Sequence, residues 1–207
     1  MINYWELNKE KMFELTFQHL SMVIQTIAIS IVVASLILFL SSGYPKLIGS
    51  VITIFSLTYS IPSLAIFALL IPFSGLGKTT AMIGLVIYCQ YILLRNFWTA
   101  IQEVDDIITE SAFALGMTKL QVLFKIQIPQ AMGGLLAGIR IASTATIGIA
   151  TISAAINAGG LGILLFDGLR TMNVIKILWG VILVGILCLF IDLTIRSFEL
   201  YFSKKWG

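Results

Sequence analysis

The chain has 207 residues, of which 58% are hydrophobic and 11% are charged, and its formal net charge is +3. Soluble domains carry about 25% charged residues, so this composition, with a mean hydropathy of +1.01, excludes an ordinary soluble domain and predicts an integral membrane protein. The net charge says little by itself, because the positions of Lys and Arg relative to the apolar segments decide the orientation of such a protein.

The first membrane span is predicted over residues 20–40. A rise of about 1.5 Å per residue gives this apolar run a length of roughly 31 Å, which is enough to cross the hydrocarbon core of a bilayer. The residues before it, 1–17, are polar and contain three Glu and two Lys, which does not fit a cleavable signal peptide. We therefore expect the first span to remain as a helix.

A second span is predicted over residues 47–71, and it contains the sequence Ser60-Ile61-Pro62-Ser63. Proline lacks a backbone N–H and kinks a helix, which a membrane tolerates only against protein or water. Broken helices often line transport paths, but Pro is also simply common in spanning helices. Both interpretations of Pro62 stay open.

The loop after the second span contains Gly77-Lys78-Thr79, which looks like the end of a phosphate-binding P-loop. A P-loop also requires Gly five positions before Gly77, where this chain has Pro72, and a strand before the loop. We therefore expect a tight loop that does not bind ATP. The third span follows over residues 80–97.

Residues 103–129 form a charged, amphipathic segment between two apolar runs, and they predict two short helices with a break between them. Asp105 and Asp106 offer oxygens that cap the first helix and place negative charge at its positive end. Gly116 is expected to end this helix, because Gly adopts φ > 0 without steric cost.

The second short helix is predicted to begin at Thr118, which forms a capping-box pattern with Gln121. Pro129 stands where this helix must stop or turn. On continuous helical spacing, one face of the segment would hold four apolar side chains, those of Phe113, Met117, Leu120 and Phe124.

The fourth span, residues 130–157, consists largely of small residues. Gly134, Gly138 and Ala142 form a small-xxx-small ridge, which lets helix backbones approach closely. This predicts a position at the centre of the bundle or at a subunit interface. Arg140 lies in the same span, where a central Arg costs about 2.5–3.5 kcal/mol on insertion scales, so we expect it to face protein or water.

The chain after the fourth span, Ala158-Gly159-Gly160-Leu161-Gly162, predicts a flexible exit. Residues 159–174 could also contain a short re-entrant or sixth segment. The last span covers residues 175–195 and contains Asp192. An ion pair with Arg196 at i, i+4 is the simplest interpretation of this carboxylate.

Candidate metal ligands are few. His19 is the only His and stands at the edge of the first span, so a proton relay or metal site built on it is not expected. Cys89 and Cys188 lie inside apolar runs without metal-ligand neighbours, which favours small buried side chains over a disulfide or a metal pair.

Five spans would place the two termini on opposite sides of the membrane. One side then holds seven basic residues, namely Lys46, Arg95, Lys119, Lys125, Arg196, Lys204 and Lys205. The other side holds five, namely Lys9, Lys11, Lys78, Arg170 and Lys176. This positive-inside bias, although weak, predicts a cytoplasmic C-terminus and an N-terminus outside.

Residues 110–129 resemble the cytoplasmic "EAA" signature of the membrane subunits of ABC importers. That signature reads E-A-A, three residues, Gly, nine residues, then I-x-L-P. The chain has Glu110-Ser111-Ala112, then Gly116, then Ile126-Gln127-Ile128-Pro129 at the same spacing, with Ser for the second residue and Ile for Leu as the departures. An ordinary amphipathic loop on the membrane surface is the alternative.

Further stretches are similar to one branch of this family, the osmoprotectant importers for glycine betaine, carnitine or choline. These stretches are residues 60–65, 94–96, 110–117, 137–140 and 159–162. Permeases for methionine and polar amino acids share similar stretches, so a permease for methionine or another amino acid is the alternative. The resemblance covers about residues 18–200.

The resemblance implies an all-α, membrane-spanning bundle of about five transmembrane helices, with a cytoplasmic coupling helix between spans three and four. It implies a multi-pass protein of the bacterial cytoplasmic membrane. The expected partners are a second permease subunit (identical or paralogous), two ABC ATPase subunits and an extracytoplasmic substrate-binding protein. Nucleic acid is not an expected partner. No cofactor, metal or catalytic residue is expected on this chain, because ATP and Mg²⁺ would bind the ATPase subunits.

The residues expected to contact the ATPase lie in and around the signature: Glu110, Ser111, Ala112, Leu115, Gly116, Met117, Leu120, Ile126 and Pro129. Candidates for the translocation path are Ser60, Pro62, Ser63, Arg140, Ser143 and Thr146. Aromatic side chains could attract a quaternary ammonium ligand by cation–π interaction. Aromatic residues of membrane spans, however, more often pack against other helices or lie at the membrane–water interface. The aromatic candidates are Tyr59, Tyr88, Tyr91, Trp98 and Trp179.

Two other classes of function stay open on the sequence. A stand-alone channel or secondary carrier without an ATPase would be favoured by inverted repeats or paired broken spans, whereas the chain has one Pro-broken span and no evident internal symmetry. A membrane scaffold without a transport role is opposed only weakly, by Arg140 and Pro62. The sequence also leaves open the substrate, the gating residues and whether the permease pair is a homodimer or a heterodimer.

Overall fold

The computed structural model describes residues 1–41 and 43–206, and within those residues the ordered elements are all helical. The all-α fold class expected from the sequence is confirmed. In chain order the elements are α1 (Ile2–Ser41), α2 (Pro45–Tyr59), α3 (Ser63–Ser74), α4 (Lys78–Gln102), α5 (Asp106–Ala114), α6 (Lys119–Val122), a π-helical turn (Leu123–Gln127), α7 (Ile128–Ile152), a 3-10 turn (Ser153–Ile156), α8 (Gly162–Arg170) and α9 (Val174–Trp206).

Four helical stretches are long and apolar enough to cross a membrane, namely Asn3–Ser41, Lys78–Gln102, Lys119–Ile156 and Val174–Phe202. A fifth crossing is made if α2 and α3 count as one span, although the two helices are bent by 98° at the break between them. This agrees with the predicted bundle of about five transmembrane helices. The helices are longer than the predicted spans, most clearly α1, which includes the polar residues at its start.

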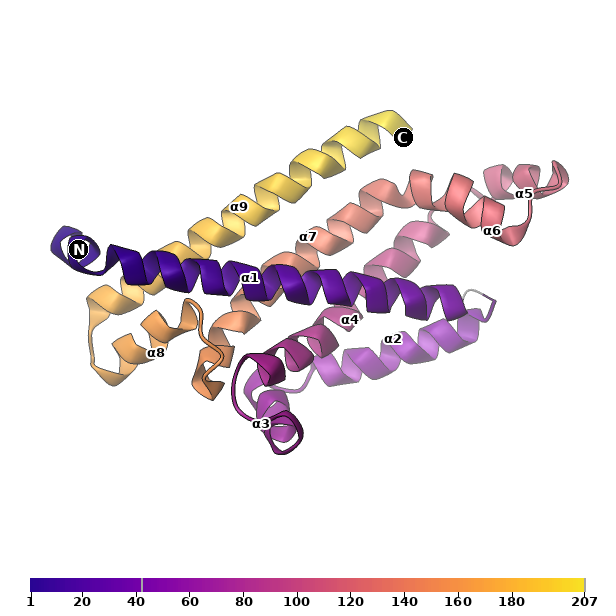
Figure 1. Cartoon of the computed structure of the whole chain (residues 1–207). Coiled ribbons are helices and arrows are strands. Elements are labelled where there is room, and N and C mark those ends of the chain that lie inside the picture. Colours follow the sequence, from indigo (N-terminus) through magenta and orange to yellow (C-terminus); the bar gives the residue numbers. More distant parts are fainter. Residues whose placement is uncertain (42, 207) are drawn as a thin grey trace.

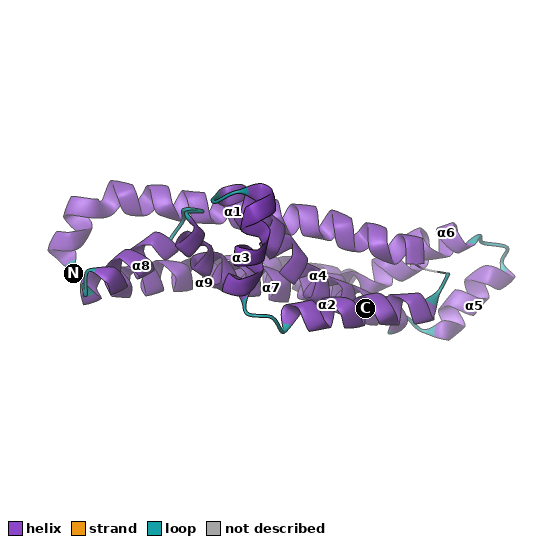
Figure 2. Ribbon diagram, turned by 90° about the horizontal axis from the view of Figure 1, so that it is seen from below, coloured by secondary structure: helices purple, strands orange, loops and turns teal. Residues whose placement is uncertain are grey.

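The long helices run along a common direction, so each end of the bundle gathers distant parts of the chain. The N-terminus and α8 lie at one end, whereas α5 and α6 lie at the other, on the side toward which α9 and the C-terminus extend (Figure 1). A view from below shows the same elongated bundle, with α5 and α6 projecting at one end (Figure 2). The termini therefore point toward opposite ends of the molecule.

The small-residue ridge of α7 lies at the centre of the bundle, where α7 packs against α1, α4 and α9. A Cβ atom added to Gly134 would lie 2.7 Å from the Cβ of Ala100, and one added to Gly138 would lie 2.7 Å from the Cβ of Asn96. Ala142 is completely buried. Glycine is required here because the backbones of α4 and α7 approach too closely for a side chain.

The chain that follows α7 is packed rather than loose, so the expectation of a flexible exit is wrong. Asn157, Gly159 and Gly160 adopt positive φ and turn the backbone back onto α1. The amide of Gly160 donates a hydrogen bond to Oε1 of Gln18 at 3.3 Å, and Leu161 is completely buried. The segment left open between the last two spans contains α8, a helix of nine residues, which is too short to cross a membrane.

The stretch that resembles the end of a P-loop is a tight turn between two helices. Gly75 has φ 78° and Gly77 has φ 118°, and these two residues connect the end of α3 with the start of α4. Pro72 lies inside α3, so the element before the turn is a helix and not the strand that a P-loop requires. The prediction of a tight loop is confirmed.

Candidate functional site

The charged segment between α4 and α7 begins with a capped helix. Asp105 is the N-cap of α5, and its carboxylate accepts a hydrogen bond of 2.8 Å from the amide of Ile107. Asp106 lies in the first turn, where negative charge interacts favourably with the helix dipole. The start of this helix is therefore specified by two adjacent residues, as predicted.

Helix α5 ends at a Schellman motif centred on Gly116. The amide of Met117 donates to the carbonyl of Ala112 at 3.1 Å, and the amide of Gly116 donates to the carbonyl of Phe113 at 2.9 Å. Gly116 has φ 82°, the left-handed conformation that this motif requires. A Cβ atom added there would meet nothing within 4 Å, so the position is open to any partner that approaches it.

A reciprocal capping box begins α6. The amide of Gln121 donates to Oγ1 of Thr118 at 3.3 Å, while the amide of Thr118 donates to Oε1 of Gln121 at 2.9 Å. Both parts of the predicted pattern are thus present. The cap and the Schellman motif leave only a short connection between the two helices, so their relative orientation is fixed by local backbone hydrogen bonds.

Helix α6 does not stop or turn at Pro129, so that prediction is wrong. It continues through the π-helical turn Leu123–Gln127 into α7, and Lys119–Ile156 forms one span-length stretch. Pro129 occupies the second position of α7. Just before it, the amide of Ile128 donates to the carbonyl of Leu123, five residues back. This shift out of the α-helical register accommodates a proline, which cannot donate the regular hydrogen bond.

Exposed apolar side chains cover the outer surface of this segment. Leu115 is 84% exposed, Leu120 is 55% exposed and Phe124 is 58% exposed. Phe113 is also exposed and Met117 is half-buried. The single face expected from continuous helical spacing is interrupted, because the turn at Gly116 separates α5 from α6.

The nine residues expected to contact an ATPase all lie in this one region of the chain, from α5 to the start of α7. Five of them are exposed in the chain, namely Glu110, Ser111, Leu115, Gly116 and Leu120. Met117, Ile126 and Pro129 are half-buried. Ala112 is buried, and α5 packs against α6 and the π-helical turn. Most of the residues expected to contact the ATPase, from Glu110 to Leu120, are therefore accessible to a partner.

The break at Pro62 separates α2 from α3 and leaves non-helical backbone in the second crossing. Ser60 and Pro62 are exposed, whereas Ser63 is half-buried at the start of α3. The hydroxyl of Tyr88, on α4, donates a hydrogen bond to the carbonyl of Ile61. This contact compensates for a backbone carbonyl left without a helical partner, which is the requirement for a broken helix inside a membrane.

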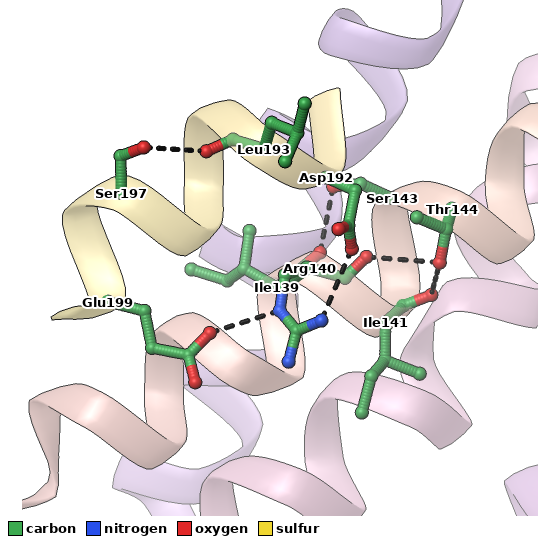
Figure 3. A network of polar contacts seen from close by, with 9 residues as sticks. All are labelled: Ile139, Arg140, Ile141, Ser143, Thr144, Asp192, Leu193, Ser197 and Glu199. Carbon is green, nitrogen blue, oxygen red and sulfur yellow. Dashed lines mark hydrogen bonds and ion pairs between the residues drawn. The ribbon is translucent and has the colours of Figure 1, made fainter. Parts of the chain in front are cut away.

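Arg140 faces α9, where it contacts two carboxylates. Its Nη1 lies 3.2 Å from Oδ1 of Asp192, and its Nε lies 3.0 Å from Oε2 of Glu199 (Figure 3). The side chains of Arg140 and Asp192 are each 29% exposed, and that of Glu199 is 24% exposed. The prediction that Arg140 faces protein is confirmed, whereas the predicted pairing of Asp192 with Arg196 is wrong, because Asp192 pairs with Arg140.

The other polar candidates of α7 point into the bundle. The Oγ of Ser143 donates to the carbonyl of Ile139 at 2.7 Å, and Oγ1 of Thr146 donates to the carbonyl of Ala142 at 2.7 Å. Both residues are 3% exposed. Thr146 also contacts the thiol of Cys89 on α4 at 3.6 Å. Within a single chain neither hydroxyl lines an open surface, and that of Thr146 joins α7 to α4.

His19 is a buried contact that the sequence interpretation missed. It is completely buried, and its Nε2 lies 3.2 Å from the carbonyl of Ile147 on α7. As the only His of the chain, it could have been singled out from the sequence. Nothing local in the sequence, however, indicates its partner 128 residues away. Glu199 was missed for the same reason, because its contact with Arg140 depends on how α7 and α9 pack.

Residues 27–206 match the family described as the binding-protein-dependent transport system inner membrane component. The chain belongs to this family. The resemblance expected from the signature residues is thereby confirmed, and the chain is a multi-pass inner membrane permease of the ABC importer type. The segment from Glu110 to Pro129, which resembles the signature of such permeases, lies between the long helix α4 and the body of α7.

Individual members of the permease family match along nearly the whole chain. The carnitine transport permease protein OpuCB of Listeria monocytogenes is 34% identical over 205 residues, which is 99% of this chain and 94% of that protein. The glycine betaine/carnitine/choline transport system permease protein OpuCB of Bacillus subtilis is 32% identical over 205 residues, with the same shares covered.

A solved structure shares the fold of this permease. The MetNI methionine ABC transporter, in an inward-facing conformation, aligns with a TM-score of 0.84 and 21% identity, covering 92% of this chain and 95% of that one. At this identity the likeness concerns the fold alone. It agrees with the all-α architecture of this chain.

Proposed function

We propose that this permease imports a quaternary ammonium osmoprotectant, such as glycine betaine, carnitine or choline, by alternating access driven by a separate ATPase subunit. The observation that carries the proposal is full-length similarity to permeases named for these solutes, at 34% and 32% identity. Carnitine and glycine betaine share a trimethylammonium group and a carboxylate, whereas choline has the ammonium group alone.

The segment α5–α6 is the element that couples transport to the ATPase. Its support is the exposed apolar surface formed by Leu115, Leu120 and Phe124 at one end of the bundle. Apolar side chains exposed to water next to a membrane need a partner to bury them. Because α6 continues without interruption into α7, a movement of the segment would be transmitted directly along a membrane-spanning helix.

The chain acts together with a second permease subunit, two ATPase subunits and an extracytoplasmic binding protein. A bundle of about five crossings supplies half of a translocation path, and a two-fold partner completes it. ATP and Mg²⁺ bind to the ATPase subunits, so this chain is not itself an enzyme. The signature end lies in the cytoplasm with the C-terminus, and the N-terminus lies outside.

The proposal is tested by uptake into cells that lack their own osmoprotectant importers. The permease is expressed with its ATPase and binding protein, and uptake of radiolabelled carnitine, glycine betaine, choline and methionine is measured at high osmolarity. We expect ATP-dependent uptake of at least one quaternary ammonium compound and none of methionine. Uptake of methionine alone, or of none of the four solutes, would refute the assignment of substrate class.

A further inference from the structure

Three tyrosines from two elements meet at the break in the second crossing. Tyr59 is the last residue of α2, whereas Tyr88 and Tyr91 lie near the middle of α4. The ring of Tyr59 lies 5.7 Å from that of Tyr88 and 5.2 Å from that of Tyr91, measured between centroids. The hydroxyl of Tyr88 is bound to the carbonyl of Ile61, which holds the cluster in place at the break.

A positive charge lies one helical turn from these rings. Nη1 of Arg95 donates to the hydroxyl of Tyr91 at 2.7 Å, and the guanidinium carbon lies 6.0 Å from the centre of the Tyr91 ring. Arg95 is exposed. In the part of the chain that the structure describes, both ion pairs belong to Arg140, so the charge of Arg95 has no carboxylate partner there.

The backbone beside the cluster is exposed and non-helical. Ser60, Ile61 and Pro62 form the connection between α2 and α3, and all three are exposed in the single chain. Irregular backbone at membrane depth is tolerated only where protein or a water-filled cavity covers it. Transporters place such breaks at their substrate sites. We therefore expect the exposed backbone at this break to lie against a water-filled path or a two-fold partner.

We propose that Tyr59, Tyr91 and Arg95, held in place by the buried ring of Tyr88, form a transit site for zwitterionic quaternary ammonium solutes. A trimethylammonium group has no N–H to donate, so aromatic faces are the groups that recognise it. Tyr91 is already paired with Arg95, so the half-exposed ring of Tyr59 receives the ammonium group. The guanidinium of Arg95 then binds the carboxylate, because planar guanidinium groups match carboxylates.

This site predicts a preference between solutes of the proposed class. Carnitine and glycine betaine use both the rings and Arg95, whereas choline uses the rings alone and is repelled by the guanidinium. The inference rests on the proposed function, since it assumes that quaternary ammonium solutes cross this membrane subunit. It adds the residues that distinguish a zwitterion from a simple cation.

The test uses the complete importer in proteoliposomes, with saturating loaded binding protein and labelled carnitine or choline. Tyr59→Leu should lower uptake of both solutes by roughly five- to thirtyfold, the range expected for loss of a desolvated cation–π contact. Tyr59→Phe keeps the ring and should lower uptake much less than Tyr59→Leu. Tyr201→Leu is the matched control, because this exposed tyrosine of α9 lies outside the cluster.

Arg95→Gln should lower uptake of carnitine by roughly tenfold more than uptake of choline, since a charge-assisted contact is lost for the zwitterion alone. Arg196→Gln, another exposed arginine, should not change the ratio between the two solutes. A merely structural role of Arg95 would lower both solutes equally. Recovery of the assembled complex and its basal ATP hydrolysis are measured for every variant, so that folding defects are recognised.

The outcomes separate the site from the proposed function. One outcome is that the wild-type importer takes up carnitine or choline while Tyr59→Leu shows the same uptake and Arg95→Gln leaves the ratio of carnitine to choline uptake unchanged. In that case the transit site is wrong and the proposed function stands. If the wild-type importer takes up none of glycine betaine, carnitine and choline, the proposed function fails, and the transit site fails with it.

Discussion

The carboxylate of Asp192 lies 3.2 Å from the guanidinium of Arg140, although 52 residues separate them in the sequence. Glu199 binds the same guanidinium, so the two ion pairs connect α7 with α9. Because α7 is continuous with α6, the ion pairs join the segment proposed to contact the ATPase to the last membrane-spanning helix.

Arg140→Leu leaves the carboxylates of Asp192 and Glu199 without their partner, so it should lower the free energy of unfolding of the permease. We expect a cost of about 1–3 kcal/mol, seen as a drop of several degrees in Tm of the detergent-solubilised protein, with membrane insertion intact and assembly or transport impaired. Asp192→Asn removes one of two contacts and should cost less. Arg196→Gln is the matched control, and an equal loss of Tm in this variant would contradict the ion-pair account.

Gly138→Ala tests the close approach of α4 and α7. The new Cβ would lie 2.7 Å from the Cβ of Asn96, so the helices must separate, at a cost of about 1–3 kcal/mol. Gly148→Ala lies on the same helix with nothing within 4 Å and should leave Tm unchanged or slightly raised. The Tm of both variants is measured by thermal unfolding in detergent. If Gly148→Ala lowers Tm as much as Gly138→Ala, the close contact between Gly138 and Asn96 has no special role.

Gly160→Ala tests whether the turn after α7 is held by α1. Its φ is 75°, and a Cβ atom there would lie 2.8 Å from Nδ1 of the buried His19. Gly116→Ala also places alanine at a positive φ, 82°, but no atom lies within 4 Å of the added Cβ. Both changes should cost about 1 kcal/mol from strain, and Gly160→Ala should lose clearly more Tm because of the added clash. Equal losses would show that the packing against His19 is loose.

The orientation of the chain is tested with reporter fusions. The termini point toward opposite ends of the bundle, and the bias of basic residues favours a cytoplasmic C-terminus. A reporter that works only in the cytoplasm should be active after Lys205 and inactive before Glu6. Reporters on both termini with the same location would require an even number of crossings and would exclude the five-crossing arrangement.

Local features of the signature segment were predictable from the sequence because they depend on neighbours a few residues apart. The cap at Asp105, the turn at Gly116 and the capping box of Thr118 each involve hydrogen bonds within five positions. The glycine ridge of α7 was predictable for a similar reason, since its spacing alone places it on one face of a helix.

Contacts between distant segments were not predictable in the same way. Asp192 has Arg196 one turn away, and only the packing of α7 on α9 decides that Arg140 is its partner. The break at Pro62 was expected, but its pairing with the hydroxyl of Tyr88 depends on how α3 and α4 are placed. Pro129 was misinterpreted because the π-helical turn before it leaves no simple pattern in the sequence.

Coupling through the signature turn is the central claim, and Gly116→Val addresses it most directly. Valine is strained at φ 82°, and its side chain would occupy the open space through which a partner approaches. Gly116→Asn separates the two effects, because Asn tolerates the left-handed conformation but still adds a side chain. Gly43→Val, at a glycine in the turn after α1 with nothing within 4 Å, is the control for adding valine at an exposed turn.

The decisive measurement is ATP hydrolysis by the reconstituted importer, with and without loaded binding protein, run alongside uptake. In Gly116→Val the permease should insert normally and still bind the loaded binding protein, while stimulation of ATP hydrolysis and uptake are both lost. Gly116→Asn should be intermediate, and Gly43→Val should behave as the wild type. Normal stimulation and normal uptake in Gly116→Val would show that this turn does not couple the permease to its ATPase.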